Sequence, residues 1–477
     1  MRIVRIVLIL AACGALALTF SVIARSSPPQ EAAEAAGARS ELDDVAERAA
    51  GLLARYIAID TTNPPGNEIE GANFLAAILE AEGIEARVFE SEPRRGSLYA
   101  RLPGTGTKKA VLLLSHIDVV PVDRDEWSHD PYAGSVVGGS LFGRGALDSK
   151  GVGIVELLAM IALKRSGRPL DRDVVLMATA DEETGGRLGA GWMIENHFDL
   201  VRDVEFVLNE GGFIHHSDNM PLIFNINAAE KAPCWFRITA SGDPGHASRA
   251  PEQTAVTRLV EALGALIAWE RPLEVGPVVA GYYSAYAAID EQHAREFRDL
   301  DRALESPEFR RWFLSDPGAA ALVRDTLTPT VLEGSSKTNV VPATAVAEVD
   351  SRLLPGHDCD DFLAAVRRRV AGPNVVVEPT GTAFPSSQSP IDNELTASVE
   401  RVAAEESQPS VVLPGLLAGF TDSHWFRERG IDAYGFVPIE VTAEQRAAIH
   451  GPNENVEVVA LERGVKRLVA LLRELDR

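Results

Sequence analysis

The stretch A-V-L-L-L-S-H-I-D-V-V-P (residues 110–121) decides the fold. Its first five residues are apolar, which is typical of a central strand that is buried on both faces. The sequence then turns polar and places His116 and Asp118 at the end of this strand, where open α/β sheets carry their ligand sites. Because residues i and i+2 of a strand share a face, His116 can bind a metal while Asp118 holds its imidazole ring. An ordinary hydrogen-bonded histidine is the alternative, and an isolated H-x-D pattern favours it.

The composition is that of a globular protein. A chain of 477 residues with 46% hydrophobic residues is long enough for two or three domains, each with its own core. The formal charge of -23 argues against nucleic acid as a partner, because phosphate backbones attract basic surfaces. The three cysteines are too few for a disulfide framework, and we do not expect a zinc site built from thiolates.

The N-terminus has the pattern of an export segment. Arg2 and Arg5 precede an apolar run over residues 6–24, so residues 1–25 are either a signal peptide that is removed or an uncleaved membrane anchor. Residues 26–40 are rich in Ala, Ser, Pro and Glu and indicate a linker. We therefore expect an exported protein that is periplasmic, secreted or anchored to a membrane.

The remaining chain predicts one domain interrupted by another. Strand and helix patterns alternate over residues 41–228, which predicts an α/β catalytic domain with helices on both faces of its sheet. Residues 229–380 predict two strand-helix-strand units of a smaller, inserted α+β domain, with helical decoration on it at 285–325. Residues 381–477 then complete the first domain.

Acidic residues recur where strands and loops of the first domain end. Three adjacent acids after the apolar strand at 173–180 are costly to bury unless a cation lies beside them; a solvated acidic loop is the alternative. The glycine-rich turn at 143–151 lacks a phosphate-binding fingerprint, so we do not expect it to bind phosphate. Together, the ends of these strands and loops supply two imidazoles and three carboxylates, namely His116, Asp148, Glu183, Glu210 and His450.

Such a set suits two zinc ions, for which cobalt can substitute, with nitrogen and oxygen ligands and a position left for water. Asp148, alone on its loop, is the natural bridge between them. His116 and Glu210 would complete one site, and Glu183 and His450 the other. Glu182, next to a ligand, would be the general base that activates the bridging water.

Eight motifs carry a resemblance to a known family. They are S-H-I-D-V-V-P (115–121), G-R-G-A-L-D-S-K-G (143–151), D-E-E-T-G-G (181–186), N-E-G-G (209–212), P-G-H-A-S (244–248), N-V-V-P (339–342), D-S-R-L-L-P-G (350–356) and H-G-P-N-E (450–454). In order and spacing, the chain from residue 41 to 477 resembles the co-catalytic zinc aminoacylases and exopeptidases, which include carboxypeptidase G, acetylornithine deacetylase, succinyl-diaminopimelate desuccinylase and aminoacylase. The stretch 285–325 and G-F-T-D-S-H (419–424) resemble the branch of carboxypeptidase S and the N-fatty-acyl-amino-acid hydrolases.

The resemblance implies a mixed-sheet zinc exopeptidase-like catalytic domain with an inserted lid and dimerisation domain. It also implies the five metal ligands, Asp118 as the residue that orients a ligand, Glu182 as the base, and a cis bond after Asp148. One departure is Asn209, which stands where many relatives have an acid, so Glu210 must be the ligand.

Three further roles follow from the resemblance alone. His246 matches a lid histidine that donates to the developing oxyanion, commonly from the partner subunit of a dimer. Asn339 and Arg352 match lid residues that hold the substrate, the arginine through its free carboxylate. An ordinary loop histidine and a structural salt bridge are the alternatives at His246 and Arg352.

These expectations together predict a zinc-dependent metallohydrolase. It would cleave the amide bond of a peptide or an N-acyl amino acid that carries a free carboxylate, as a carboxypeptidase or an aminoacylase does. The alternative is an exported, non-catalytic relative that binds peptides or acyl amino acids.

Overall fold

The computed structural model describes residues 40–218, 220–381 and 383–477. The predicted export segment at 1–25 and all of the predicted linker at 26–40 except Ser40 lie outside these residues. In the described part, no helix is both long enough and apolar enough to cross a membrane.

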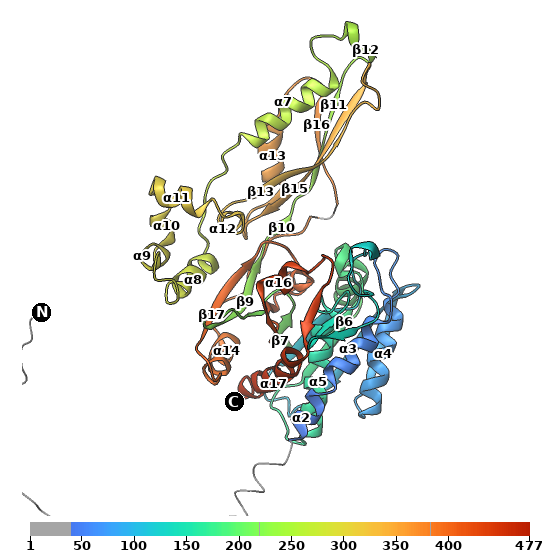
Figure 1. Cartoon of the computed structure of the whole chain (residues 1–477), viewed down its shortest axis with the longest axis vertical. Helices are drawn as coiled ribbons and strands as arrows, with labels where there is room; N and C mark the ends of the chain where they lie inside the picture. The colour runs from blue at the N-terminus through green and yellow to red at the C-terminus, as the bar shows by residue number, and fades with distance from the viewer. Residues whose placement is uncertain (1–39, 219, 382) are drawn as a thin grey trace, which may run out of the picture. The chain divides into compact units, whose positions relative to one another are not determined.

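A mixed sheet of ten strands forms the centre of the larger part of the structure (Figure 1). Strand β3 (Ala110–His116) lies between β6 (Val174–Thr179) and β7 (Val204–Asn209) and runs parallel to both. The prediction of a central strand in this stretch is confirmed. The other strands are β1 (Ala86–Glu92), β2 (Arg95–Leu102), β18 (Asp432–Gly435), β9 (Leu222–Glu230), β8 (Ile214–His215), β19 (Glu440–Val441) and β17 (Ser410–Leu417), which pairs with β9.

Two separate cores cover the two faces of this sheet, which explains why β3 is apolar from Ala110 to Leu114. Leu113 packs into one core, whereas Leu112 and Leu114 pack into the other. The first face is covered by α2 (Glu41–Ala46), α3 (Ala49–Ile57), α4 (Glu68–Ala81), α5 (Lys150–Arg165), α14 (Glu394–Ala404) and α17 (Val458–Glu474). The second is covered by α6 (Trp192–Asn196) and α15 (Ser423–Arg427). The predicted α/β architecture with helices on both faces is confirmed.

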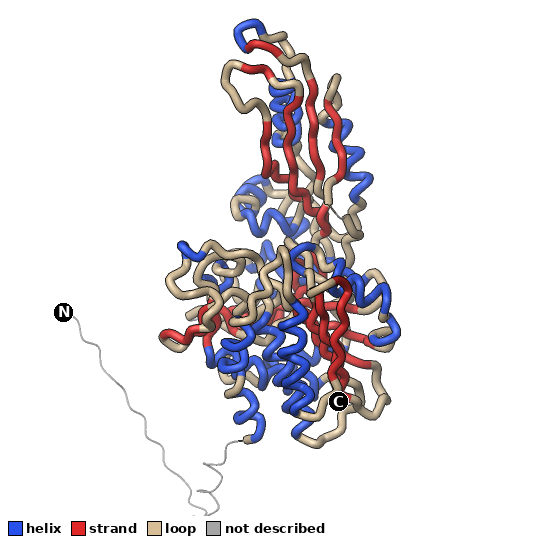
Figure 2. Tube along the Cα trace, turned by 90° about the vertical axis from the view of Figure 1, so that its right-hand side faces the viewer, coloured by secondary structure: helices blue, strands red, loops and turns tan. Residues whose placement is uncertain are grey.

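A second, smaller sheet has a core of its own. Its strands are β10 (Ala232–Pro233), β15 (Thr344–Leu353), β11 (Phe236–Ser241), β16 (Val375–Pro379) and β13 (Thr326–Glu333), which pairs with β15. Helices α7 (Ala255–Ile267) and α13 (Cys359–Arg369) pack along it, as Figure 1 shows. In Figure 2 its strands form one layer, drawn in red. We call this sheet and its two helices the lid.

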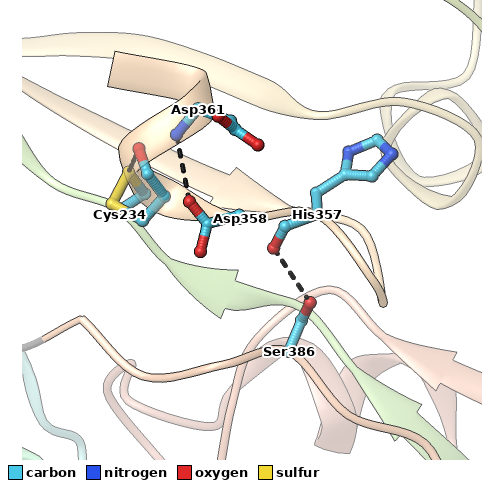
Figure 3. Close-up of a disulfide and its surroundings, with 6 residues drawn as sticks. Cys234, His357, Asp358, Asp361 and Ser386 are labelled. Carbon is cyan, nitrogen blue, oxygen red and sulfur yellow. Dashed lines mark hydrogen bonds between the residues drawn. A yellow bond between two sulfur atoms is a disulfide. The ribbon is translucent and has the colours of Figure 1, made fainter. Parts of the chain in front are cut away.

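A disulfide between Cys234 and Cys359 closes the lid core (Figure 3). It joins the chain between β10 and β11 to the start of α13, where Asp358 caps the helix by accepting a hydrogen bond from the backbone N–H of Asp361. Ser386 donates a hydrogen bond to the carbonyl oxygen of His357 just before this cap. The expectation of no disulfide framework missed this bond, because a separation of 125 residues says nothing about proximity in space.

Five short helices form what we call the helical insert: α8 (Pro277–Tyr286), α9 (Ala294–Phe297), α10 (Leu300–Ala303), α11 (Pro307–Phe313) and α12 (Pro317–Leu322). The stretch 285–325 was expected to decorate the lid. Instead, Val279, Tyr283 and Phe297 belong to the same core as Phe224 and Leu416 of the large sheet. The insert packs against this edge because β9 and β17 expose an apolar surface to it. The lid core, in contrast, is already covered by α7 and α13.

Candidate metal centre

The candidate centre lies at one edge of the large sheet, where three parallel strands end. His116 is the last residue of β3, and Glu210 directly follows β7. Glu182 and Glu183 lie in the short turn after β6. Because β6 and β7 flank β3 and run parallel to it, these side chains meet at the same carboxyl edge.

Asp148 joins the strand ends to a distant loop. Its Oδ1 lies 2.8 Å from Nε2 of His116, and its Oδ2 lies 3.0 Å from Nε2 of His450. Glu210 Oε2 lies 3.5 Å from Nε2 of His116, and Glu183 Oε2 lies 3.2 Å from Nε2 of His450. The structure therefore brings all five predicted ligands together as two groups of three that share Asp148.

The chemistry of these groups fits a pair of divalent cations. Burial raises the pKa of Glu210 to about 7 and also raises that of Glu183, because the loss of hydration outweighs the opposing effects of His116 and His450. Oε1 of Glu183 is buried and has no hydrogen-bond partner among the described residues. Imidazole nitrogens and carboxylate oxygens are the ligands that zinc takes in catalytic sites. The centre thus combines nitrogen and oxygen atoms that can bind a metal with buried carboxylates that a cation would stabilise.

Asp118 shapes the centre through its backbone carbonyl, which contacts His116, and through its carboxylate, which binds the turn after β6. Nδ1 of His116 lies 2.9 Å from the carbonyl oxygen of Asp118 and 3.5 Å from its carboxylate. A carbonyl only accepts, so Nδ1 carries the proton and Nε2 keeps its lone pair for a metal. The Asp118 carboxylate instead accepts hydrogen bonds of 3.1 Å from the backbone N–H groups of both Glu182 and Glu183, and one of 2.8 Å from the Asn63 amide.

Glu182 shares the turn with the candidate ligand Glu183. Burial, followed by the charge of Glu210, raises the pKa of the Glu182 carboxyl well above its usual range. A carboxyl group whose pKa is raised beside a metal centre is suited to take up a proton during catalysis.

Glu454 is a buried residue of this site whose role the sequence did not reveal. It is 0% exposed, and its carboxylate accepts hydrogen bonds from Arg144 Nη1 at 2.6 Å and from the backbone N–H groups of Gly145, Leu147 and Asp148 at 2.8–3.1 Å. It therefore fixes the loop that carries Asp148, whose bond to Ser149 is cis as the resemblance implied. Its place in the H-G-P-N-E motif was the only signal.

The segment 419–424 is hydrogen-bonded to the ends of strands β6 and β7, next to the centre. Asn209, which departs from the family pattern, donates hydrogen bonds to the hydroxyls of Thr421 and Ser423 at 3.0 and 3.1 Å. Asp422 accepts a 2.8 Å hydrogen bond from Thr179, and burial raises the pKa of Asp422 to about 8. Asn209 is thus a structural anchor for this segment, and the carboxylate at position 210 faces the metal centre.

In the described part of the chain, none of the three predicted lid residues has a hydrogen bond or ion pair with a candidate metal ligand. His246 and Asn339 are exposed and adjacent, since β12 (Gly245–His246) pairs with β14 (Val340–Val341). Among the described residues, the ring of His246 contacts Ser248 and none of the candidate ligands. Arg352 lies elsewhere, 5.7 Å from the ring of Phe420, in an ion pair with Asp350 at 3.2 Å.

A mixed α/β sheet with this donor set at its strand ends defines a metal-dependent hydrolase. Residues 112–474 match Peptidase family M20/M25/M40, and the chain belongs to this family. The match confirms the predicted family and the prediction that the chain is an enzyme.

Known relatives cover most of the chain. Aminoacylase-1B of Rattus norvegicus is 28% identical over 88% of this chain and 94% of its own length. The N-fatty-acyl-amino acid synthase/hydrolase PM20D1 of Xenopus tropicalis is 29% identical over 76% of this chain and 72% of its own. The M20 family metallo-carboxypeptidase Sso-CP2 from Sulfolobus solfataricus has the same fold, with a TM-score of 0.70 at 21% identity over 89% of this chain and 98% of its own.

Proposed function

We propose that this protein is a zinc hydrolase that cleaves the amide bond of an N-acyl amino acid or short peptide with a free carboxylate. One observation carries the proposal: two groups of donors share Asp148, with Glu182 on the turn that supplies one of them. The relatives support the substrate class, because two that match most of the chain are named as an aminoacylase and as an N-fatty-acyl-amino acid synthase/hydrolase.

In this proposal the metal ions are held by His116, Asp148 and Glu210 on one side and by Asp148, Glu183 and His450 on the other. When bound, two such ions supply a Lewis acid for the carbonyl oxygen and make a water molecule acidic near neutral pH. Glu182 accepts a proton from the attacking water and returns it to the leaving amine. Asp118 keeps Glu182 in place through its hydrogen bond to the backbone.

Arg352 is the candidate for recognising the substrate carboxylate. Its planar guanidinium can bind a carboxylate through two parallel hydrogen bonds. In the structure it is half-buried beside Phe420 and paired with Asp350, which leaves a purely structural ion pair as the competing role. Arg352→Lys separates the two: it should raise KM for substrates with a free carboxylate but not for the corresponding amides, whereas a structural role would affect both alike.

We further propose a homodimer in which His246 and Asn339 act in the partner's centre. Both residues are exposed and apart from the metal donors of their own chain, which is what such a role requires. The lid also exposes apolar side chains, namely Val256, Val260, Ile267, Leu332 and Val340. Mixing His246→Ala chains with Glu182→Gln chains tests this directly, because only action across the dimer restores activity in the mixture.

An exported location is also proposed. The Cys234–Cys359 disulfide supports it, since such bonds persist mainly in oxidising compartments. Cell fractionation, with the mass of the mature N-terminus, decides between secretion, periplasmic release and membrane anchoring.

The proposed activity is tested with purified protein loaded with zinc or cobalt. A panel of N-acetyl amino acids, N-fatty-acyl amino acids and dipeptides is scanned by mass spectrometry, with chelated protein as the blank. Glu182→Gln should abolish turnover, and the same change at exposed Glu195 in α6 should not. A protein that binds less than one metal per chain and hydrolyses nothing would instead be the non-catalytic binding relative.

A further inference from the structure

A buried arginine, Arg95, lies at the edge of the large sheet that carries the metal centre. It is the first residue of β2, and because β2 runs antiparallel to β6, the start of β2 lies beside the end of β6. Arg95 is 8% exposed, and its Nη2 lies 2.8 Å from Oε1 of Glu68 and 2.7 Å from Oδ1 of Asp181. Neither acid belongs to the candidate metal ligands. The proposed hydrolysis assigns no role to this buried cluster of one cation and two acids.

Asp181 links Arg95 to the proposed base. It directly precedes Glu182 and has a φ of 72°, in the left-handed region that residues other than glycine adopt only at a cost. Its carboxylate accepts hydrogen bonds from Arg95 Nη2 at 2.7 Å, from the Thr184 hydroxyl at 2.6 Å and from the Leu188 backbone N–H at 2.9 Å. These contacts hold the backbone where it turns from β6 toward Glu182.

A second route runs from Arg95 through Asn63. Arg95 Nη1 donates a 3.2 Å hydrogen bond to Oδ1 of Asn63, which leaves the amide nitrogen of Asn63 free to donate elsewhere. This nitrogen donates to Oδ2 of Asp118 at 2.8 Å and to the Thr184 hydroxyl at 3.2 Å. Asp118 in turn accepts hydrogen bonds from the first two backbone N–H groups of the turn Glu182–Thr184. Arg95 therefore holds this turn through two routes.

The planar guanidinium allows both routes to be held together. Its Nη2 serves Asp181 and its Nη1 serves Asn63, at a spacing that the planar group fixes. A lysine would keep the positive charge, but its single nitrogen cannot take the positions of both Nη atoms. Arg95→Lys therefore separates the charge of this residue from its geometry.

We propose that Arg95 is a positioning residue for the proposed base: through Asp181 and Asn63 it holds the Glu182 carboxylate within reach of the attacking water. The inference rests on the proposed hydrolase function and adds the residue that places its base. In this role Arg95 binds no metal and takes up no proton. A displacement of about 1 Å at a catalytic group can cost about 100-fold in rate, so loss of this geometry should lower kcat by about that factor.

The test compares the zinc-loaded wild type with Arg95→Lys and with Arg101→Lys. Arg101 lies on the same strand and also pairs with two acids, Asp173 and Asp203, but it lies opposite Val175 near the start of β6, away from the centre. The substrate is the one with the highest kcat/KM in a panel of N-acetyl amino acids, N-fatty-acyl amino acids and dipeptides. Arg95→Lys should lower kcat about 100-fold with KM and zinc content unchanged, and Arg101→Lys should keep the wild-type kcat.

The same substitution in a Glu182→Gln background separates positioning of the base from a general effect on the fold. Once the Glu182 carboxylate is gone, Arg95 has no base left to place. Arg95→Lys should therefore change the residual rate, measured in single turnovers with excess enzyme, by less than about twofold.

A second variant, Asn63→Ala, interrupts only one route and leaves the ion pairs of Arg95 in place. It should lower kcat about tenfold, and it should have no such effect in the Glu182→Gln background. It provides the same comparison if circular dichroism shows that Arg95→Lys does not fold.

An unchanged kcat in folded, zinc-loaded Arg95→Lys protein would overturn the proposal. An equal loss of rate with and without the Glu182 carboxylate would also overturn it, since Arg95 would then act on the metal ions or on the fold and not on the base. A wild type that holds two zinc ions and hydrolyses no member of the panel would overturn the proposed function, and the role of Arg95 with it.

Discussion

Replacing Glu454 tests how the loop of Asp148 is held. This carboxylate is fully buried and accepts four hydrogen bonds, one of them charge-assisted from Arg144. Glu454→Ala leaves the Arg144 guanidinium, itself only 2% exposed, without its counter-charge. Breaking a buried ion pair from one side costs about 3–5 kcal/mol, so we expect the free energy of unfolding to fall by that amount.

The same substitution should also weaken metal binding. Residues that orient a ligand commonly change metal affinity by about 10- to 100-fold when they are removed. Glu454→Gln keeps an oxygen that can accept from the N–H groups of Leu147 and Asp148 but loses the charge opposite Arg144. The Arg144 guanidinium is left without a counter-charge here too, so the loss of stability should be close to that of Glu454→Ala, while the retained oxygen should preserve more of the zinc affinity.

Urea unfolding of the metal-free protein gives the stability, and competition with a chromogenic chelator gives the zinc affinity. Glu457→Ala, at an exposed position three residues away, is the matched control and should change stability by less than about 0.5 kcal/mol. The reasoning is refuted if Glu454→Ala behaves like this control in both measurements.

Three further predictions concern the centre and the lid. Glu182→Gln should lower kcat by about a hundred- to ten-thousandfold with unchanged zinc content, measured by turnover and elemental analysis; an unchanged kcat would exclude it as the base. Hydrogen bonds with Asp148 and Glu183 raise the pKa of His450 to about 10 in the metal-free protein, so its ring is protonated below that pH. Zinc must displace this proton, and its apparent affinity should rise as the pH approaches 10, which calorimetry in buffers of different ionisation enthalpy would show; a pH-independent affinity would contradict it. Reducing the Cys234–Cys359 bond, which spans 125 residues, should lower the free energy of unfolding by about 2–5 kcal/mol in urea titrations, and an unchanged midpoint would count against the bond.

The strand ends of the centre could be predicted because their signal is local. An apolar run followed at once by His116, Glu183 or Glu210 marks the carboxyl end of a buried strand. Parallel neighbours then bring these ends together without further information. The fold class followed from the same alternation of strands and helices.

Other features depend on contacts between distant segments. Glu454 looks like a loop acid, and its burial depends on Arg144, which lies 310 residues earlier. Two lone cysteines gave no indication that α13 would bring them together. The packing partner of the short helices at 277–322 could not be predicted either, because an amphipathic face shows that a helix is covered but not which surface covers it.

The metal content of Asp148→Ala tests the central claim most directly, because this residue alone belongs to both groups of donors. Native mass spectrometry of the wild type should show two zinc ions per chain. Asp148→Ala should lose tight binding of both ions while keeping its circular dichroism spectrum, whereas His450→Ala should lose only one. Two tightly bound zinc ions in the Asp148→Ala protein, or fewer than one in the wild type, would contradict a centre bridged by Asp148.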